Sequence, residues 1–232
     1  MKGLDNRTLR QEIKFKVFDV DASDFYRWLQ VRSPFRKAYP SRHISSIYFD
    51  TVNYDFAASN MSGESSRIKL RARWYPEKIE NSLLERDNNT KYRIELKRKI
   101  NNLSDKTILD AFYLNEKDQE TKLSSLRHRT TLAFNPSSTN IINPVIKINY
   151  SRDYFQAHKS ESLRLTVDKN ITYQTITGLN KNLLSISYFI VEIKFDPNIR
   201  NKVEKILSDF PFRMVRNSKY LACLSQVKNN SY

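Results

Sequence analysis

The 232-residue sequence predicts an α+β fold made mainly of antiparallel strands, with helices packed on the outside of the sheet. Several segments alternate polar and apolar residues with the period of two that is typical of strands with one buried face. Other segments space their apolar residues as helices do and can cover the apolar side of such a sheet. The length suits one sizeable core and no shift in composition marks a second, so we expect a single domain over residues 1–232.

The N-terminal part is expected to form a strand and then a helix. Residues 11–17 (QEIKFKV) alternate charged and apolar side chains, which predicts a strand. Residues 21–31 (DASDFYRWLQV) have apolar side chains at helical spacing. Asp21 or Ser23 is available as the N-cap of this helix, and Pro34 lies beyond its end.

Three further strands and a polar loop are expected next. Residues 45–51 (SSIYFDT) have the composition of a strand. Residues 67–75 (RIKLRARWY) and 91–99 (KYRIELKRK) alternate charged with apolar side chains, and we expect these two segments to pair as a hairpin. The polar segment between them, residues 76–89, is expected to be a long loop.

The second half of the chain mixes helical and strand patterns. Residues 106–134 have helical spacing in parts, and residues 135–144 form a turn-rich connector within the domain. We expect strands at 144–155, 163–170 and 188–196, followed by a helix around 201–210. Residues 217–227 (NSKYLACLSQV) form the last segment, and their pattern does not decide between a helix and a strand.

The charge of the chain indicates a polyanionic partner. The formal net charge is +15 and the isoelectric point is near 9.8. Nucleic acid, an anionic membrane surface and a phosphate-rich small molecule are all compatible with this excess of cations. Charge alone does not choose among them.

Several common sites are excluded or disfavoured by what the sequence lacks. Only three glycines are present, so neither a phosphate-binding loop of the G-x-x-x-x-G-K-[ST] type nor a G-x-G-x-x-G turn can form. His43, His128 and His158 stand too far apart for a zinc-ligand motif, and Cys223 is the sole cysteine, which indicates a structural role. The most apolar stretch, residues 183–193, is too short to span a bilayer, so we expect a cytoplasmic chain.

The polar faces of the predicted strands carry most of the candidate site residues. An extended chain places every second residue on one side, so RIKLRARWY puts four cations on a single face. The polar faces contain, strand by strand, Glu12 and Lys14; Lys69, Arg71 and Arg73; Arg93, Glu95 and Lys97; Arg164, Thr166 and Asp168; and Glu192 and Lys194. For any one strand, the simplest interpretation is a solvated sheet face.

The mixture of charges across five strands favours a more specific interpretation. A surface that binds nucleic-acid phosphates would avoid carboxylates, because they repel the ligand. Carboxylates beside cations instead suit phosphate together with Mg²⁺ or Mn²⁺, and Glu12, Glu95, Asp168 and Glu192 offer the oxygen ligands that these ions prefer. If the sheet closes, its interior becomes a cationic channel, in which like charges 4 Å apart repel by about 4 kcal/mol and require an anionic ligand.

Eight segments of the sequence, taken in order, resemble a known family. The ordered segments EIKFKV, SSIYFDT, RIKLRARWY, RIELKRK, YSRDY, RLTVD, VEIKFD and NSKY are similar to those of the VTC domain, the polyphosphate polymerase module within the CYTH-like triphosphate tunnel metalloenzyme superfamily. The resemblance covers nearly the whole chain. It implies a closed, tunnel-like antiparallel β-barrel of about eight strands whose basic lining binds triphosphate.

The resemblance also implies roles for individual residues. It assigns catalytic contacts to Arg71, Arg73, Lys97 and Lys219. It assigns phosphate binding to Lys14, Lys69, Lys106, Arg152, Arg164, Lys194 and Ser218. Glu192 matches the metal-binding glutamate of the family, and Glu95, Asp168 and Glu12 are further metal candidates. Glu95 and Asp168 would alternatively orient neighbouring cations through ion pairs.

The sequence departs from the family patterns in two places, one that bears on the reaction and one that bears on the geometry of a strand. The related CYTH hydrolases open with E-x-E-x-K, whereas this chain has Arg10 in place of the first carboxylate, before Glu12 and Lys14. Losing a metal ligand favours a transferase over a hydrolase that activates water. Arg152 shares strand parity with Tyr150 rather than with Lys147, so its strand is expected to be bulged, twisted or only partly exposed to the lumen.

The function expected from the resemblance is metal-dependent polyphosphate synthesis, in which the γ-phosphoryl group of ATP passes to a growing chain. The alternatives are a tunnel triphosphatase and a noncatalytic polyphosphate-binding module. The partners expected are ATP, polyphosphate and Mn²⁺ or Mg²⁺, without a specific nucleic acid, and a peripheral contact with a membrane or membrane protein is compatible with the charge. Trp74, Tyr75 and Tyr48 could stack a base, but their strand positions favour core packing.

Overall fold

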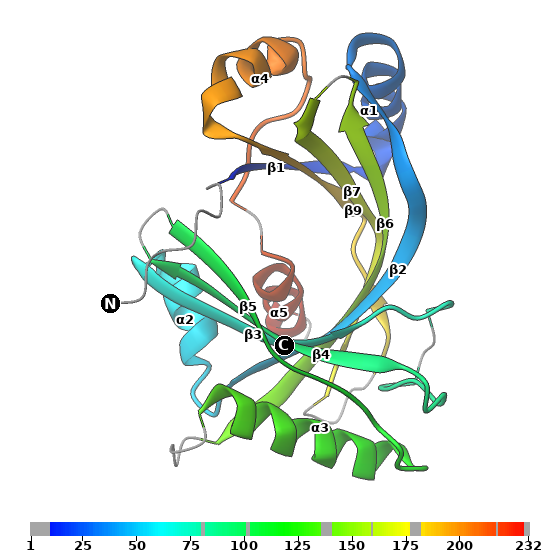
Figure 1. Ribbon diagram of the computed structural model, residues 1–232, viewed down its shortest axis with the longest axis vertical. Coiled ribbons are helices and arrows are strands. Elements are labelled where there is room, and N and C mark those ends of the chain that lie inside the picture. The colour runs from blue at the N-terminus through cyan, green and yellow to red at the C-terminus, as the bar shows by residue number, and fades with distance from the viewer. Residues whose placement is uncertain are drawn as a thin grey trace. The chain divides into compact units, whose positions relative to one another are not determined.

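The computed structural model describes residues 10–79, 82–100, 103–135, 141–158, 160–176, 182–216 and 218–229. Within these residues the fold is α+β, with one mainly antiparallel sheet in the strand order β1–β9–β7–β6–β2–β3–β4–β5 and with β8 paired to β7 (Figure 1). The strands are β1 (Gln11–Phe18), β2 (Phe35–Thr51), β3 (Ser66–Trp74), β4 (Lys91–Ile100), β5 (Leu103–Tyr113), β6 (Ile142–Ala157), β7 (Ser160–Thr175), β8 (Leu184–Ser185) and β9 (Tyr188–Phe195). The α-helices are α1 (Ala22–Arg27), α2 (Asp55–Ser62), α3 (Gln119–Phe134), α4 (Arg200–Leu207) and α5 (Lys219–Asn229).

The expected closed barrel is not formed by the described residues. The strand order begins at β1 and ends at β5 rather than returning to its start. The outer edge of β1 is instead met by the segment around Met214, which forms an isolated bridge with Phe15. The amide of Val215 donates to the carbonyl oxygen of Lys14 at 2.8 Å. The segment thus covers part of an edge that would otherwise expose unpaired backbone groups.

The chain divides into two compact units, which are described separately. Unit 1 comprises Met1–Ser41, Ser151–Asn170 and Ser187–Asn217, and unit 2 comprises Arg42–Tyr150, Ile171–Ile186 and Ser218–Tyr232, each considered only where the structure describes it. The boundaries fall inside the long strands β2, β6 and β7, so each of these strands contributes to both units. The single domain expected from the sequence stays a prediction.

Unit 1 has its core on the apolar face of β1, β7 and β9. Phe15 and Val17 alternate with charged residues along β1 and are both buried. Phe25 of α1 and Phe210, which follows α4, belong to the same buried cluster, and the rings of Phe15 and Phe210 have centroids 4.5 Å apart. Because the apolar side chains take one face, Lys14 and its charged neighbours occupy the other.

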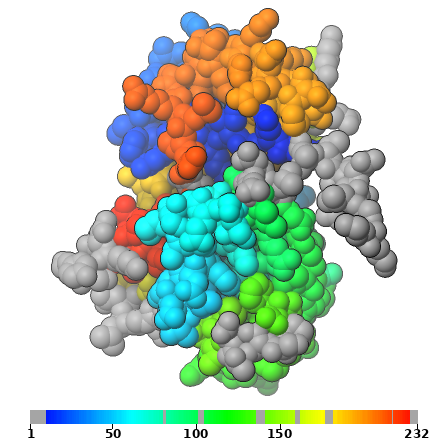
Figure 2. Space-filling model, turned by 90° about the vertical axis from the view of Figure 1, so that its left-hand side faces the viewer, coloured from blue at the N-terminus to red at the C-terminus, as the bar shows by residue number. Residues whose placement is uncertain are grey.

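Unit 2 has helices on both faces of its sheet. α3 lies against the apolar face, where Leu126 joins Leu70 and Leu96 in one buried cluster. α5 lies on the opposite face (Figure 1), and Tyr220 of α5 stacks on Tyr48 of β2 with the ring planes 4° apart. The expectation that the helices cover only the apolar side of the sheet is therefore wrong for α5. In a second view, α2 forms part of the surface of unit 2 (cyan, Figure 2).

The predicted hairpin is confirmed. β3 and β4 pair in antiparallel register, with Leu70 opposite Leu96 on the buried face and Arg71 opposite Glu95 on the charged face. The helix expected at residues 21–31 is also present, as α1 followed by a π-helical turn at Trp28–Arg32.

Other elements differ from the sequence-based expectations. Residues 103–113, part of which was expected to be helical, form the strand β5, and only α3 is a helix within 106–134. β5 pairs with β4 through a register shift between Ile94 and Glu95, which interrupts the regular alternation that identifies a strand. β2 begins ten residues before the expected segment 45–51, and α2 and α5 were not expected.

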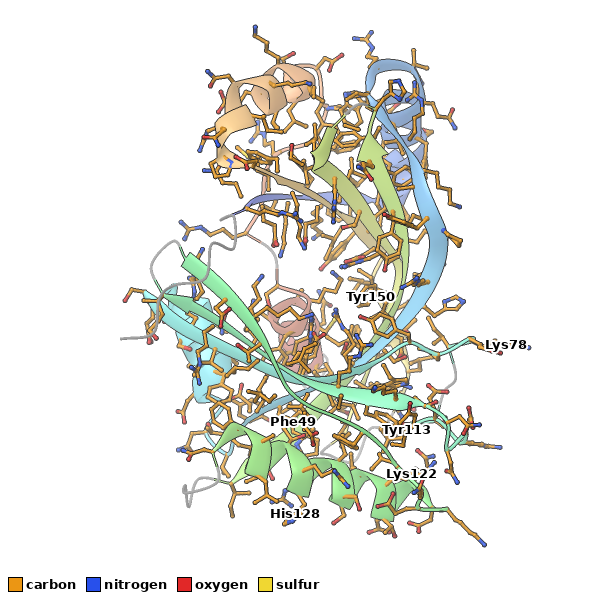
Figure 3. All side chains as sticks on the ribbon, in the orientation of Figure 1. Phe49, Lys78, Tyr113, Lys122, His128 and Tyr150 are labelled. Carbon is orange, nitrogen blue, oxygen red and sulfur yellow. The ribbon has the colours of Figure 1, made fainter. Side chains whose placement is uncertain are left out.

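The segment at residues 76–89 contains no helix or strand where it is described, as expected for a loop. Two buried lysines hold it. The Nζ atom of Lys122 donates to the carbonyl oxygen of Glu85 at 2.9 Å, and Nζ of Lys147 donates to the carbonyl oxygen of Ser82 at 2.7 Å. Lys122 extends from α3 toward the sheet, whereas His128 lies on the exposed side of the same helix (Figure 3). The loop is thus anchored to the core of unit 2 by buried hydrogen bonds.

Candidate functional site

The charged face of unit 2 is organised by strand register. Tyr48 of β2 lies opposite Arg71 of β3, and Arg71 lies opposite Glu95 of β4. Arg73 follows Arg71 on the same face, and Lys106 reaches Glu95 from β5. We call Tyr48, Arg71, Arg73, Glu95 and Lys106 the Glu95 group. It brings together four residues that the sequence analysis assigned to the site and adds the hydroxyl of Tyr48.

Glu95 is the centre of this group. Nε and Nη2 of Arg71 donate to its Oε2 atom at 2.9 and 2.6 Å. Nη1 of Arg73 lies 3.8 Å from the same oxygen, and Nζ of Lys106 lies 2.7 Å from Oε1. Three cations therefore share one carboxylate that is almost fully buried.

The surplus of cations over carboxylates in the Glu95 group shifts the pKa values of its members. Burial would raise the pKa of Glu95, but the charges of Arg71, Arg73 and Lys106 outweigh it and lower the pKa to about 2. Burial also opposes the charge of Arg71, and the neighbouring Tyr48 and Glu95 nevertheless raise its pKa. Glu95 and Arg71 are therefore both charged at neutral pH. The group contains three cationic side chains and one carboxylate, so its formal charge is positive.

Tyrosine hydroxyls complete the coordination of the two arginines. Nη1 of Arg71 donates to the hydroxyl of Tyr48 at 3.1 Å, and Nη2 of Arg73 donates to the hydroxyl of Tyr150 at 3.0 Å. Burial would raise the pKa of Tyr48, but Arg71, Arg73 and Lys219 lower it below its ordinary value. The hydroxyl oxygen of Tyr48 accepts from Arg71, so the hydroxyl proton of Tyr48 can be donated to a ligand.

α5 supports this arrangement through residues that the sequence analysis did not select. The hydroxyl of Tyr220 donates to Oδ2 of Asp50 at 2.7 Å, while its ring stacks on Tyr48. Asp50 also accepts from the amides of Phe56 and Ala57 at the start of α2, each at 2.9 Å. The parity of SSIYFDT places Tyr48 and Asp50 on one face, but a contact with residue 220 has no local sequence signal.

Lysines extend the charged face beyond the Glu95 group. Lys69, Lys97 and Lys106 lie side by side on β3, β4 and β5. Lys219, at the start of α5, places Nζ 4.7 Å from the centre of the Tyr150 ring. Ser218 directly precedes this helix, and its carbonyl oxygen accepts from the amide of Ala222. Unit 2 therefore contains all of the predicted catalytic residues, together with Lys69, Lys106, Ser218 and Glu95 from the other predicted sets.

The charged face of unit 1 holds a second group. Lys14 of β1 lies opposite Glu192 of β9, and Glu12 lies opposite Lys194. Nζ of Lys14 is 2.7 Å from Glu12 and 3.5 Å from Glu192. Nζ of Lys194 is 2.7 Å from Glu192 and 3.7 Å from Glu12. We call these four residues the Glu192 group, in which two carboxylates and two ammonium groups alternate.

Lys14 stays charged within the Glu192 group. Burial would lower the pKa of Lys14, but Glu192 and Glu12 raise it.

Two residues of β7 extend the same charged face. Thr166 lies opposite Glu192 in the β7–β9 register, and Arg164 lies opposite Lys194. The Thr166 hydroxyl is buried and has no hydrogen-bond partner among the described residues. A buried hydroxyl of this kind could form a hydrogen bond with a ligand or a water, or bind an ion through its oxygen.

Arg152 and Asp168 form a separate pair in unit 1. Nε and Nη2 of Arg152 donate to the two carboxylate oxygens of Asp168 at 2.5 and 2.7 Å. Arg152 has the same strand parity as Tyr150, whose hydroxyl accepts from Arg73 on the charged face. Lys147 has the opposite parity and donates to the carbonyl oxygen of Ser82. Regular alternation along β6 therefore accounts for the position of Arg152.

The four predicted metal ligands differ in how they fit a divalent ion. All four carboxylates pair with protein cations: Asp168 with Arg152, Glu95 with three cations, and Glu12 and Glu192 with Lys14 and Lys194. They differ in that Glu12 and Glu192 bring two carboxylates into one group of ion pairs. No group of three or more histidine, cysteine, aspartate or glutamate side chains that could hold a metal is found in the described part of the chain. Glu12 and Glu192 lie together beside the unpartnered Thr166 hydroxyl. This set fits Mg²⁺ or Mn²⁺ bound through one or two carboxylates and substrate oxygens.

The aromatic candidates have different environments. Trp74 is fully buried against Tyr92, as core packing predicts. Tyr48 is buried, but on the charged face. Tyr75 is 41% exposed, and the guanidinium of Arg93 lies 5.8 Å from the centre of its ring. Core packing was therefore the wrong expectation for Tyr75. Cys223 is buried, as expected, and burial raises its pKa to about 12.

One family model and the solved structure of the PH1819 protein support the fold. The family model described as VTC domain matches residues 8–228. The solved structure of the PH1819 protein from Pyrococcus horikoshii OT3 superposes with a TM-score of 0.51 and 17% identity, covering 96% of this chain and 99% of that chain. The candidate adenylyl cyclase HpAC1 from Hippeastrum, described as having a dominant triphosphatase activity, gives a TM-score of 0.48 with 17% identity over 93% of this chain and 96% of that chain.

A third solved structure, a candidate adenylate cyclase from Vibrio parahaemolyticus, gives a TM-score of 0.49 with 12% identity over 94% of this chain and 98% of that chain. None of the curated proteins matches the chain. In the described residues, no helix has the length and apolar character needed to cross a membrane.

Proposed function

Because the chain belongs to the VTC domain family, we propose that it is a polyphosphate polymerase that transfers the γ-phosphoryl group of ATP to a growing inorganic polyphosphate chain. The observation that carries this proposal is the Glu95 group, in which Arg71, Arg73 and Lys106 share one carboxylate. The surplus of fixed positive charge suits a polyanion, and the guanidinium groups suit phosphate oxygens because they can donate two hydrogen bonds at once.

The residues of the Glu95 group bind and orient the transferring phosphate. Arg71 and Arg73 are held by Glu95 and by the hydroxyls of Tyr48 and Tyr150, so their orientation costs little when a ligand arrives. Lys97 and Lys219 supply mobile ammonium groups on the same face of unit 2. Lys69, Lys106 and Ser218 extend the set of donors available to phosphate oxygens.

The reaction requires no protein nucleophile. A terminal oxygen of the acceptor chain forms a new bond to the γ-phosphorus, the bond from that phosphorus to the β–γ bridging oxygen breaks, and ADP leaves with the electron pair. Fixed cations around the oxygens of the γ-phosphoryl group stabilise the charge that moves toward the leaving group.

The Glu192 group supplies the proposed metal ligands. Glu192 and Glu12 would hold Mn²⁺ or Mg²⁺, and the bound ion would neutralise phosphate charge. Lys14 and Lys194, which pair with these carboxylates in the structure, would turn to phosphate oxygens, as would Arg164. Arg152 would bind phosphate while it remains oriented by Asp168.

Product analysis tests the proposal. The purified chain is incubated with ATP and Mn²⁺, and the products are separated by polyacrylamide gel electrophoresis. We expect a ladder of polyphosphate together with ADP. Release of orthophosphate without chains longer than triphosphate would contradict the polymerase proposal. The exposed pair Arg200 and Glu204 offers a matched control, because Glu204→Gln removes a carboxylate without touching the charged faces.

A triphosphatase is the second candidate. The Glu12 and Glu192 carboxylates lie within one cluster of ion pairs, and two carboxylates could hold a divalent ion that activates water. The same assay separates the two functions, since a triphosphatase converts inorganic triphosphate or ATP to orthophosphate with no elongated product. The cytoplasmic location and the membrane partner expected from the sequence stay predictions.

A further inference from the structure

An exposed aromatic and cationic patch lies next to the Glu95 group in unit 2. Tyr75 directly follows β3, and its ring is 5.8 Å from the guanidinium of Arg93 on β4. On β4, Lys91 lies two positions before Arg93 and opposite Tyr113 of β5, with the ammonium 5.9 Å from the centre of the Tyr113 ring. We call Tyr75, Arg93, Lys91 and Tyr113 the Tyr75 patch.

The register places this patch on the same face as the phosphate-binding residues. Arg93 lies directly opposite Arg73, and residues two apart on a strand share a face. Arg93 and Lys91 therefore share a face with Glu95 along β4. Tyr75 is brought to this face by its contact with Arg93. A ligand bound by Arg71 and Arg73 that extends past the end of β3 would reach Tyr75.

The exposure of the patch contrasts with the burial of the other aromatic residues nearby. Trp74 and Tyr92 pack in the core, whereas Tyr75 is 41% exposed and Tyr113 is 50% exposed. Exposed aromatic rings flanked by cations are surfaces on which nucleobases stack, because the base meets an aromatic ring or a guanidinium plane and its phosphates meet positive charge. Inorganic polyphosphate has no group that would use the rings.

We propose that Tyr75 and Arg93 form the docking site for the base of the nucleoside triphosphate, with Lys91 and Tyr113 beside it. This inference rests on the proposed function, since it places the base next to Arg73 with the phosphates toward Arg71. The site distinguishes a nucleotide from inorganic triphosphate. It also gives the substrate a direction along the strands, with the base at the Tyr75 end of β3.

Binding measurements test the inference without requiring turnover. The dissociation constants of a nonhydrolysable ATP analogue and of inorganic triphosphate are measured by calorimetry for the full chain. Tyr75→Leu is expected to weaken the affinity for the ATP analogue by about 5- to 150-fold, the range expected for losing one base–aromatic stack. Its affinity for inorganic triphosphate should be unchanged. Tyr75→Phe keeps the ring and should retain affinity for the analogue.

Two further variants sharpen the result. Arg93→Gln should also weaken the ATP analogue selectively, although the charge it removes would cause a smaller loss for inorganic triphosphate. Tyr39→Leu is the control, because Tyr39 is an exposed tyrosine of unit 1, 57% exposed and packed edge-on against Tyr154. It should change neither dissociation constant.

The outcomes separate this inference from the proposed function. If Tyr75→Leu weakens both ligands equally, or neither, the base does not dock at Tyr75 and the inference is wrong. If the base-selective loss is found but the wild-type chain makes no polyphosphate from ATP, the docking site stands and the polymerase proposal fails. Polyphosphate synthesis with no base-selective effect at Tyr75 would leave the polymerase and remove the docking site.

Discussion

Removing the charge of Glu95 should destabilise the folded chain. Glu95→Gln keeps the shape of the side chain but leaves Arg71, Arg73 and Lys106 without their shared carboxylate. The pKa of Glu95 falls from 4.5 to about 2 in the folded state. That difference corresponds to about 3 kcal/mol, and because Lys106 is 49% exposed we expect an effect of about 2 to 3 kcal/mol.

The pH dependence follows from the lowered pKa. A carboxyl group with a folded-state pKa below its unfolded value stabilises the fold above the unfolded pKa, and this contribution is lost as the pH falls through the folded pKa. The difference in unfolding free energy between wild type and Glu95→Gln should therefore be constant near neutral pH. It should close between about pH 4.5 and pH 2.

Urea denaturation at several pH values measures the difference in unfolding free energy between wild type and Glu95→Gln. In thermal melts, a loss of about 2 to 3 kcal/mol corresponds to a decrease of roughly 4 to 12 °C in the melting temperature. Inorganic triphosphate should restore part of the lost stability, because it neutralises the same cations. Glu204→Gln, which breaks an exposed pair with Arg200, should cost less than about 0.5 kcal/mol. A Glu95→Gln chain as stable as wild type at pH 7 would refute the assignment of Glu95 as the counter-charge of the group.

Three further substitutions test the site and the fold. Arg71→Ala combined with Arg73→Ala should abolish polyphosphate synthesis while far-UV circular dichroism stays native, and retained synthesis would remove both residues from the mechanism. Glu192→Gln should lower turnover by about 10- to 100-fold and raise the Mn²⁺ concentration needed for half-maximal rate. An unchanged Mn²⁺ dependence would argue against a metal ligand at this position. Lys122→Met should lower the unfolding free energy by about 1 to 3 kcal/mol in urea titrations, since the buried carbonyl of Glu85 loses its donor, and no change would show that the loop is held by other contacts.

The strand faces could be read from the sequence where alternation is regular. RIKLRARWY and KYRIELKRK pair with their cations on one face, and the register places Arg71 against Glu95. Alternation also placed Lys14 and Glu192 on the charged faces of β1 and β9. These predictions succeeded because an apolar face that must be buried fixes the direction of every other side chain.

The sequence did not predict features that depend on contacts between distant segments. β5 has a register shift opposite Glu95, so its period of two is broken and its helical appearance misled the prediction. The stacking of Tyr220 on Tyr48 joins residues far apart in the chain, and no local pattern announces it. The openness of the strand order was equally hidden, because closure depends on which segment covers the edge of β1 rather than on the alternation within β1.

Both charged groups combine cations with carboxylates, and this composition has a physical reason. A face with only lysines and arginines would be strained by repulsion whenever no ligand is bound, whereas Glu95 and Glu192 offset that repulsion and hold the cations in place. The carboxylates are too few to neutralise Arg71, Arg73 and Lys106, so a phosphate chain still gains free energy on binding. Glu95→Gln should therefore make the free chain less stable and, at the same time, increase its affinity for inorganic triphosphate. Weaker triphosphate binding by Glu95→Gln in a chain that remains folded would mean that orienting the arginines matters more than the charge that Glu95 cancels.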